Sequence, residues 1–124
     1  MPATSPQQIH QFVADAFAAG DVDAYLALCE PEAIVRPRPD QVVAGADAIR
    51  DALAPLLAMK PAMPVETTNV LEAGDIALLC SAWELTATDP DGNEVRMNGR
   101  GTEVVRRGAD GNWRLVIDNP FGTG

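Results

Sequence analysis

Residues 74–119 read GDIALLCSAWELTATDPDGNEVRMNGRGTEVVRRGADGNWRLVIDN, and two turn signals divide this stretch into three strand-like pieces. The turns, residues 89–93 and 108–112, are rich in Asp, Gly and Asn, which tight turns favour. Because the pieces match in length, they are expected to pair as a meander of three antiparallel strands. The first piece, residues 76–88, is largely apolar on both parities, which is typical of a strand covered on both faces.

The second piece, residues 93–107, differs in character between its two faces. Gly99 and Gly101 flank Arg100, so the strand can bend there or allow another backbone to approach closely. We expect Val105 on the outer face of the sheet. One parity carries Asn98, Arg100, Thr102 and Val104, and the other carries Met97, Gly99, Gly101, Glu103 and Val105.

The third piece, residues 113–119, alternates cleanly between its two faces. Asp118 falls on the opposite parity from the large apolar residues, so we expect it to point outward. A curved sheet whose concave face holds a site is therefore predicted. One face carries Trp113, Leu115, Ile117 and Asn119, and the other carries Arg114, Val116 and Asp118.

Composition limits the class of protein. The 124 residues are expected to form a single domain, residues 1–124, around one core. The net charge of −9 repels phosphate backbones and anionic lipid, so neither nucleic acid nor membrane is an expected partner. No signal peptide or membrane span is recognised, and we expect a cytoplasmic protein. Cys29 and Cys80 are expected to be reduced core residues.

Two helices are predicted near the N-terminus. The first is expected to begin with Ser5 as its N-cap and to end at Gly20, and His10 falls off its apolar stripe and is expected to be exposed. The second is expected to begin at Asp21 and to continue through Cys29 until Pro31 stops it. The apolar stripe of the first helix consists of Ile9, Phe12, Val13, Ala16 and Phe17.

A third helix is predicted after Gly45, and Pro55 inside it predicts a kink or a break near residues 51–55. Further strands are predicted over residues 33–39, 41–44 and 65–73. Pro37 and Pro39 are expected to confine the first of these to a sheet edge or a loop. The resulting order predicts an α+β fold with helices packed on one face of an antiparallel sheet.

Four motifs in this order span nearly the whole chain: AGDVDA at 19–24, VAGADAI at 43–49, the turn at 89–93, and VVRR to GNWRL between 104 and 115. Together they resemble the cone-shaped α+β barrel of the nuclear transport factor 2-like superfamily, in its SnoaL-like and ketosteroid isomerase-like branch. The resemblance implies a curved antiparallel or mixed sheet, three helices on its concave face, an apolar pocket, and a homodimer formed through the outer sheet face. This fold hosts isomerases, cyclases, epoxide hydrolases, dehydratases and members with no known activity.

The chain departs from the catalytic patterns that the resemblance implies. Where ketosteroid isomerases carry the aspartate of an Asp-Pro pair as base, this chain has Arg36-Pro37, and their oxyanion tyrosine falls at about Val13. Epoxide hydrolases of this fold pair an arginine with an acid two residues away, whereas Arg100 is followed by Thr102. Whether the chain is an enzyme therefore stays open.

The candidate catalytic residues are Arg100, Asn119 and Glu84. On the concave face, Arg100 could hold a carboxylate or an enolate oxygen, but it could also pair with a cross-strand acid such as Glu84 or face solvent. Asn119 could present its amide to the pocket or close the backbone at the strand end. Glu84 could be a pocket acid with a raised pKa or a cross-strand partner at a dimer face.

The predicted pocket binds a small apolar or semi-polar molecule, either for proton transfer, cyclisation or hydrolysis, or as a non-enzymatic ligand-binding or dimeric association domain. Trp83 and Tyr25 can line a cavity while each offers one hydrogen-bond donor. No metal or cofactor is expected, because one histidine and two distant cysteines form no metal site and no Gly-rich phosphate loop is present. The predicted pocket residues are Phe12, Phe17, Tyr25, Arg36, Met59, Met63, Trp83, Asn98, Thr102 and Ile117.

Overall fold

The computed structural model describes residues 2–122 as three helices and six strands. In chain order these are α1 (Gln8–Ala19), α2 (Val22–Ala27), β1 (Cys29–Arg38), β2 (Gln41–Ala44), α3 (Ala46–Ala58), β3 (Val65–Ala73), β4 (Ile76–Thr88), β5 (Glu94–Arg107) and β6 (Trp113–Asn119). The strands of these described residues form one mixed sheet in the order β2-β1-β6-β5-β4-β3, in which β1 and β6 run parallel and the other neighbours antiparallel. The predicted α+β class is confirmed.

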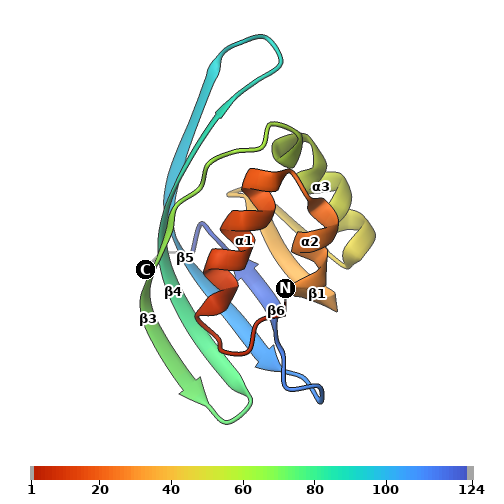
Figure 1. Ribbon diagram of the computed structural model, residues 1–124, viewed down its shortest axis with the longest axis vertical. Helices are drawn as coiled ribbons and strands as arrows, with labels where there is room; N and C mark the ends of the chain where they lie inside the picture. Colours follow the sequence, from red (N-terminus) through yellow and green to blue (C-terminus); the bar gives the residue numbers. More distant parts are fainter. Residues whose placement is uncertain (1, 123–124) are drawn as a thin grey trace.

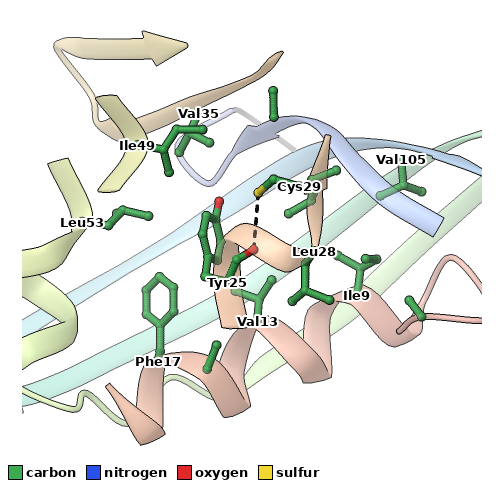
Figure 2. Packing of buried hydrophobic residues seen from close by; sticks show 14 of the residues in the cluster. Ile9, Val13, Phe17, Tyr25, Leu28, Cys29, Val35, Ile49, Leu53 and Val105 are labelled. Atoms are coloured by element: carbon green, nitrogen blue, oxygen red, sulfur yellow. Dashed lines mark hydrogen bonds between the residues drawn. The ribbon is translucent and has the colours of Figure 1, made fainter. Parts of the chain in front are cut away.

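The three helices lie together on one side of the curved sheet, as Figure 1 shows, and the β4–β5 hairpin extends beyond them. Apolar side chains from the helices meet the inner face of the sheet and form the core. Figure 2 shows the Tyr25 side chain within this core, near Val13 and Phe17 of α1 and Leu53 of α3. Burial of this apolar surface is the main force that holds the two layers together.

Local signals explain the element ends. Gly20 ends α1 in the left-handed conformation, with φ of 66°, and Asp21 caps α2 by accepting a hydrogen bond from the backbone N–H of Ala24 at 3.0 Å. The predicted N-cap at Ser5 is wrong, because α1 begins at Gln8 and its N-cap is Gln7. The Gln8 side chain does accept the backbone N–H of Ser5 at 3.3 Å, as its half of a capping box would. No helix among residues 2–122 is long and apolar enough to cross a membrane.

Neither the break that Pro55 allowed nor the edge position that Pro37 and Pro39 predicted is found in the structure. Residues 46–58 form one helix without a break, because Pro55 lies on the exposed side while Leu53 and Leu57 hold both halves against the core. β1 lies between β2 and β6 rather than at an edge. Its prolines fall where the register with its neighbours shifts, so the missing N–H groups interrupt no regular ladder.

α2 also ends earlier than predicted. Its helix stops at Ala27, and Cys29 is the first residue of β1 rather than the last turn of α2. The Cys29 thiol donates to the carbonyl oxygen of Tyr25 at 3.5 Å, the contact drawn in Figure 2. Cys29 is buried and free, as is expected of a small core residue.

Candidate functional site

An inner cavity of about 70 Å³ lies between the helices and the concave face of the sheet. Its walls are mostly apolar and come from both layers, including Val13, Phe17, Leu53, Trp83 and Leu115. The cavity exceeds the roughly 30 Å³ that one water molecule occupies in the liquid, but is smaller than the roughly 300 Å³ at which pockets for drug-sized ligands begin. A small compound therefore fits, while a molecule of steroid size requires the walls to move.

Two carboxyl groups, those of Glu103 and Asp118, line this cavity side by side. They are directly opposed cross-strand partners on β5 and β6, a position that brings side chains about 5 Å apart on one face of a sheet. Glu103 is only 3% exposed. The inner face of the sheet thus holds two acids in a cavity with mostly apolar walls.

The inward position of Asp118 corrects the sequence prediction that it points outward. Val104 pairs with Ile117 but Val105 pairs with Leu115, so Val116 is an extra residue in β6. Such a bulge reverses the faces of the residues that follow it. Leu115 is consequently buried, whereas Ile117 is 38% exposed.

His10 on α1 contacts Glu103, the first of the two carboxyl groups, through its Nε2 atom. Because an ionised carboxylate only accepts hydrogen bonds, the Nε2–H of His10 donates to Oε1 of Glu103 at 2.5 Å, and Nδ1 lies 2.5 Å from the Thr67 hydroxyl. The expectation that His10 is exposed is wrong, since it is 6% exposed. It lies beside Ile9 on the face of α1 that meets the sheet, where a charged or polar partner on β5 compensates its burial.

Tyr25 forms a hydrogen bond with the second carboxyl group, that of Asp118. Its hydroxyl donates to Oδ2 of Asp118 at 2.5 Å. Burial and the neighbouring Glu103 charge raise the pKa of Asp118 to about 7, although the Tyr25 hydrogen bond and His10 act in the opposite direction. Burial also raises the pKa of the Cys29 thiol to about 12, so this cysteine is not a thiolate nucleophile at neutral pH.

Gly99 and Gly101 give the C-terminal segment access to the inner face of β5. A Cβ atom on Gly99 would lie 3.0 Å from the carbonyl oxygen of Pro120, and a Cβ atom on Gly101 would lie 3.0 Å from the Cα atom of Pro120. The indole N–H of Trp83 donates to the same Pro120 carbonyl at 2.8 Å, and the Phe121 ring meets the Trp83 ring edge to face at 5.5 Å. The close backbone approach that the two glycines predicted is therefore present.

The predicted pocket residues divide into two groups. Phe17, Arg36, Met63 and Trp83 line the inner cavity, and Tyr25 reaches it through its bond to Asp118. Phe12 faces a separate shallow depression between α1 and α2, and Met59 is the half-buried C-cap of α3. Asn98, Thr102 and Ile117 lie on the parity of β5 and β6 that faces away from the cavity.

None of the predicted catalytic residues lines the inner cavity. Arg100 pairs with Ala82, and Glu84 pairs with Asn98, all on the outer parity of the β4–β5 ladder, where they border an open depression. Asn119 pairs with Thr102 on that same parity. Val105, expected on the outer face, is fully buried, because the inner parity of β5 continues to it from Glu103.

Sequence reasoning missed four polar residues that line the cavity: His10, Ser81, Glu103 and Asp118. Ser81 and Glu103 could have been found, since the tight turn at residues 89–93 fixes the β4–β5 register and sets Glu103 opposite the buried Leu79. Asp118 carried no such signal, because the bulge in β6 is not visible in the residue alternation. In the described part of the chain, no group of three or more His, Cys, Asp or Glu side chains could hold a metal ion.

Solved structures with the same fold define the general class. A nuclear transport factor 2-like superfamily protein from Salmonella enterica serovar Typhimurium superposes with a TM-score of 0.80 at 19% identity, over 94% of this chain and 89% of that one. A ketosteroid isomerase-like protein from Erwinia carotovora gives 0.76 at 19% identity, over 90% and 88%. A candidate calcium/calmodulin dependent protein kinase II association domain from Xanthomonas campestris gives 0.81 at 23%, over 91% and 81%. The fold is that of the nuclear transport factor 2-like superfamily.

The family follows from the sequence itself. The SnoaL-like domain matches residues 9–116, from the first turn of α1 into β6, and the chain belongs to this family. The resemblance predicted from the four motifs is thereby confirmed. No curated protein matches the chain by sequence.

Proposed function

We propose that this protein binds a small, mostly apolar molecule in the inner cavity and moves a proton on it, with Asp118 as the group that takes and returns the proton. The observation that supports this most directly is a carboxyl group in an apolar cavity, directly opposite a second carboxyl on the neighbouring strand. A carboxyl with a pKa near neutrality both accepts and donates a proton at physiological pH.

The chemistry needs no cofactor. Asp118 takes a proton from a carbon next to a carbonyl or another electron-withdrawing group, exchanges it with solvent, and returns a proton to the same or a different carbon, so that atoms and charge balance. Cyclisation can begin with the same transfer, whereas hydrolysis would begin with Asp118 taking a proton from the water molecule that attacks the substrate. The proposed base lies on β6, whereas the ketosteroid isomerase pattern would place it at Arg36, which here lines the cavity as a cation.

Hydrogen exchange in D₂O tests this proposal without a known substrate. The protein is incubated with small ketones, enones, lactones and terpenoid epoxides, and deuterium uptake by each compound is followed by mass spectrometry. At least one compound should take up deuterium faster with the wild type than with Asp118→Asn. Asp110→Asn, which replaces an exposed aspartate far from the cavity, should behave as the wild type. Equal exchange by wild type and Asp118→Asn would contradict the proposal.

We also propose that two copies associate through the outer face of the sheet. Leu71, Leu78, Val104 and Ile117 are successive cross-strand partners on β3, β4, β5 and β6. They form an apolar row on the face opposite the helices, and Leu71 remains 58% exposed. A second copy that covers this row would remove it from water.

Light scattering of the purified protein tests the dimer. Leu78→Lys places a charge in the row and should halve the molar mass, whereas Val42→Lys, at an exposed position on β2 outside the row, should not. A wild-type monomer at micromolar concentration would contradict this proposal.

The apolar row also favours a second candidate function, a non-enzymatic association domain in which the outer face matters more than the cavity. In that case a gene-deletion phenotype would be rescued by the Asp118→Asn variant but not by the Leu78→Lys variant. The opposite result would exclude the association domain.

A further inference from the structure

The strongest unexplained feature of the cavity is a carboxylate oxygen without a partner. Oε1 of Glu103 accepts from His10, but Oε2 is fully buried and has no hydrogen-bond partner among the described residues. A buried acceptor left without a donor costs on the order of 1–3 kcal/mol, and more for a charged group. A bound molecule that donates a hydrogen bond would recover this loss.

A second polar group stands beside this oxygen. A Cβ atom on Gly101 would lie 2.5 Å from Oε2 of Glu103 and 2.7 Å from Oγ of Ser81, so the two oxygens are no further apart than the sum of these distances. Ser81 is 3% exposed, lines the cavity, and makes no side-chain hydrogen bond among residues 2–122. Because both residues also line the cavity, one ligand atom between these two oxygens can reach both of them.

The hydrogen-bonding capacity of Glu103 and Ser81 determines which ligand group can bind to both. Ionised Glu103 can only accept, while the Ser81 hydroxyl can donate as well as accept. A ligand hydroxyl satisfies both, because it donates to Glu103 and accepts from Ser81. A carbonyl oxygen cannot donate, and an ammonium group offers no lone pair to Ser81.

We infer that Glu103 and Ser81 form a subsite for a hydroxyl group, and that the substrate of this protein is a small carbonyl compound that carries a hydroxyl group on an otherwise apolar skeleton. This inference rests on the proposed function for its use in catalysis, because the subsite lies next to Asp118 and would hold the substrate against it. The apolar walls accommodate the remaining skeleton, and the cavity volume limits its size.

Matched alcohol and ketone pairs test the subsite by binding alone. Cyclopentanol and cyclohexanol are compared with cyclopentanone and cyclohexanone, which have the same skeletons but cannot donate. Binding is followed by the NMR signal of the Trp83 indole N–H, which belongs to a cavity residue, with the Trp113 indole outside the cavity as internal control. The wild type should bind each alcohol at least about tenfold more tightly than its ketone.

Two variants sharpen the test. Glu103→Gln keeps an oxygen for His10 and can turn its amide N–H₂ toward the ligand, so the preference should reverse in favour of the ketones. Ser81→Ala removes no hydrogen bond of the fold and should reduce the alcohol preference several-fold. Equal binding of alcohols and ketones by the wild type, absence of binding by all four compounds, or an unchanged preference in both variants would overturn the inference.

The outcomes separate the subsite from the proposed function. If Asp118→Asn and the wild type prefer alcohols equally but neither promotes deuterium exchange in any compound, the subsite stands and the proton-transfer proposal fails. If the wild type promotes exchange but binds ketones as well as alcohols, proton transfer stands and the hydroxyl subsite fails.

Discussion

Replacing Asp118 by asparagine is expected to make the stability of the protein less dependent on pH. Asparagine has nearly the same shape, and its side-chain oxygen can still accept the hydrogen bond from the Tyr25 hydroxyl. It cannot ionise, however, and so it removes the cost of placing a negative charge beside Glu103 in the cavity. The variant should therefore gain stability relative to the wild type at alkaline pH.

The direction of this pH dependence follows from the number of protons that the folded and the unfolded protein each bind. The folded pKa of Asp118 is raised from 3.8 to about 7, so between these values the folded protein holds a proton that the unfolded chain has lost. Stabilisation by the protonated carboxyl is complete below pH 4 and is lost as the pH rises through about 7. A shift of about three pKa units corresponds to about 4 kcal/mol, part of which is already lost at pH 4.5, above the unfolded pKa.

Urea unfolding at pH 4.5, 6 and 8 measures the effect in both proteins. The free energy of unfolding of Asp118→Asn, relative to the wild type, should rise by about 2–4 kcal/mol from the lowest to the highest pH. The difference between the two proteins isolates Asp118 and the groups coupled to it. A relative stability that stays constant across this range would refute the assignment of a half-buried, neutral carboxyl at Asp118.

Three further variants test the surroundings of the site. Tyr25→Phe removes a hydrogen bond that lowers the pKa of Asp118; this pKa should rise further by NMR titration, with a stability loss of about 1–3 kcal/mol. Gly101→Ala places a methyl group 2.5 Å from Oε2 of Glu103 and should cost about 1–3 kcal/mol in chemical unfolding. Asp110→Asn should destabilise the protein at neutral pH but not near pH 2, because the neighbouring arginine lowers the pKa of Asp110 to about 2 and its ionised form favours folding.

Most of the architecture could be predicted from local signals in the sequence. The bounds of β3, β4 and β6 agree with the predicted pieces, and β5 differs by one residue, because Gly and Asp turn chemistry marks strand ends directly. Prolines misled the prediction in α3 and β1. Their cost depends on whether the affected N–H would have been paired, and that is decided by packing and by bulges rather than by the residue itself.

The candidate site was less predictable for a related reason. Arg100 was singled out for its charge between two glycines, although the glycines serve the approach of Pro120 on the inner face while Arg100 lies on the outer face. The side-chain period of a strand is two, so a single bulge at Val116 exchanges Asp118 with Ile117 between the faces. A polar residue that the alternation assigns to solvent then becomes part of the interior.

The cost of the buried polar groups is itself an argument for their function. His10, Glu103 and Asp118 could be replaced by apolar residues that fill the same space, and such replacements of buried ionic groups are often neutral or stabilising. A carboxylate oxygen without a partner adds a further cost, which a fold selected only for stability would avoid. Strained or costly polar groups that line a cavity are typical of sites where a ligand supplies the missing partner. The unpaired oxygen of Glu103 beside Asp118 is therefore the place where the hydroxyl of a bound molecule, exchanging with water, would complete the hydrogen bonding.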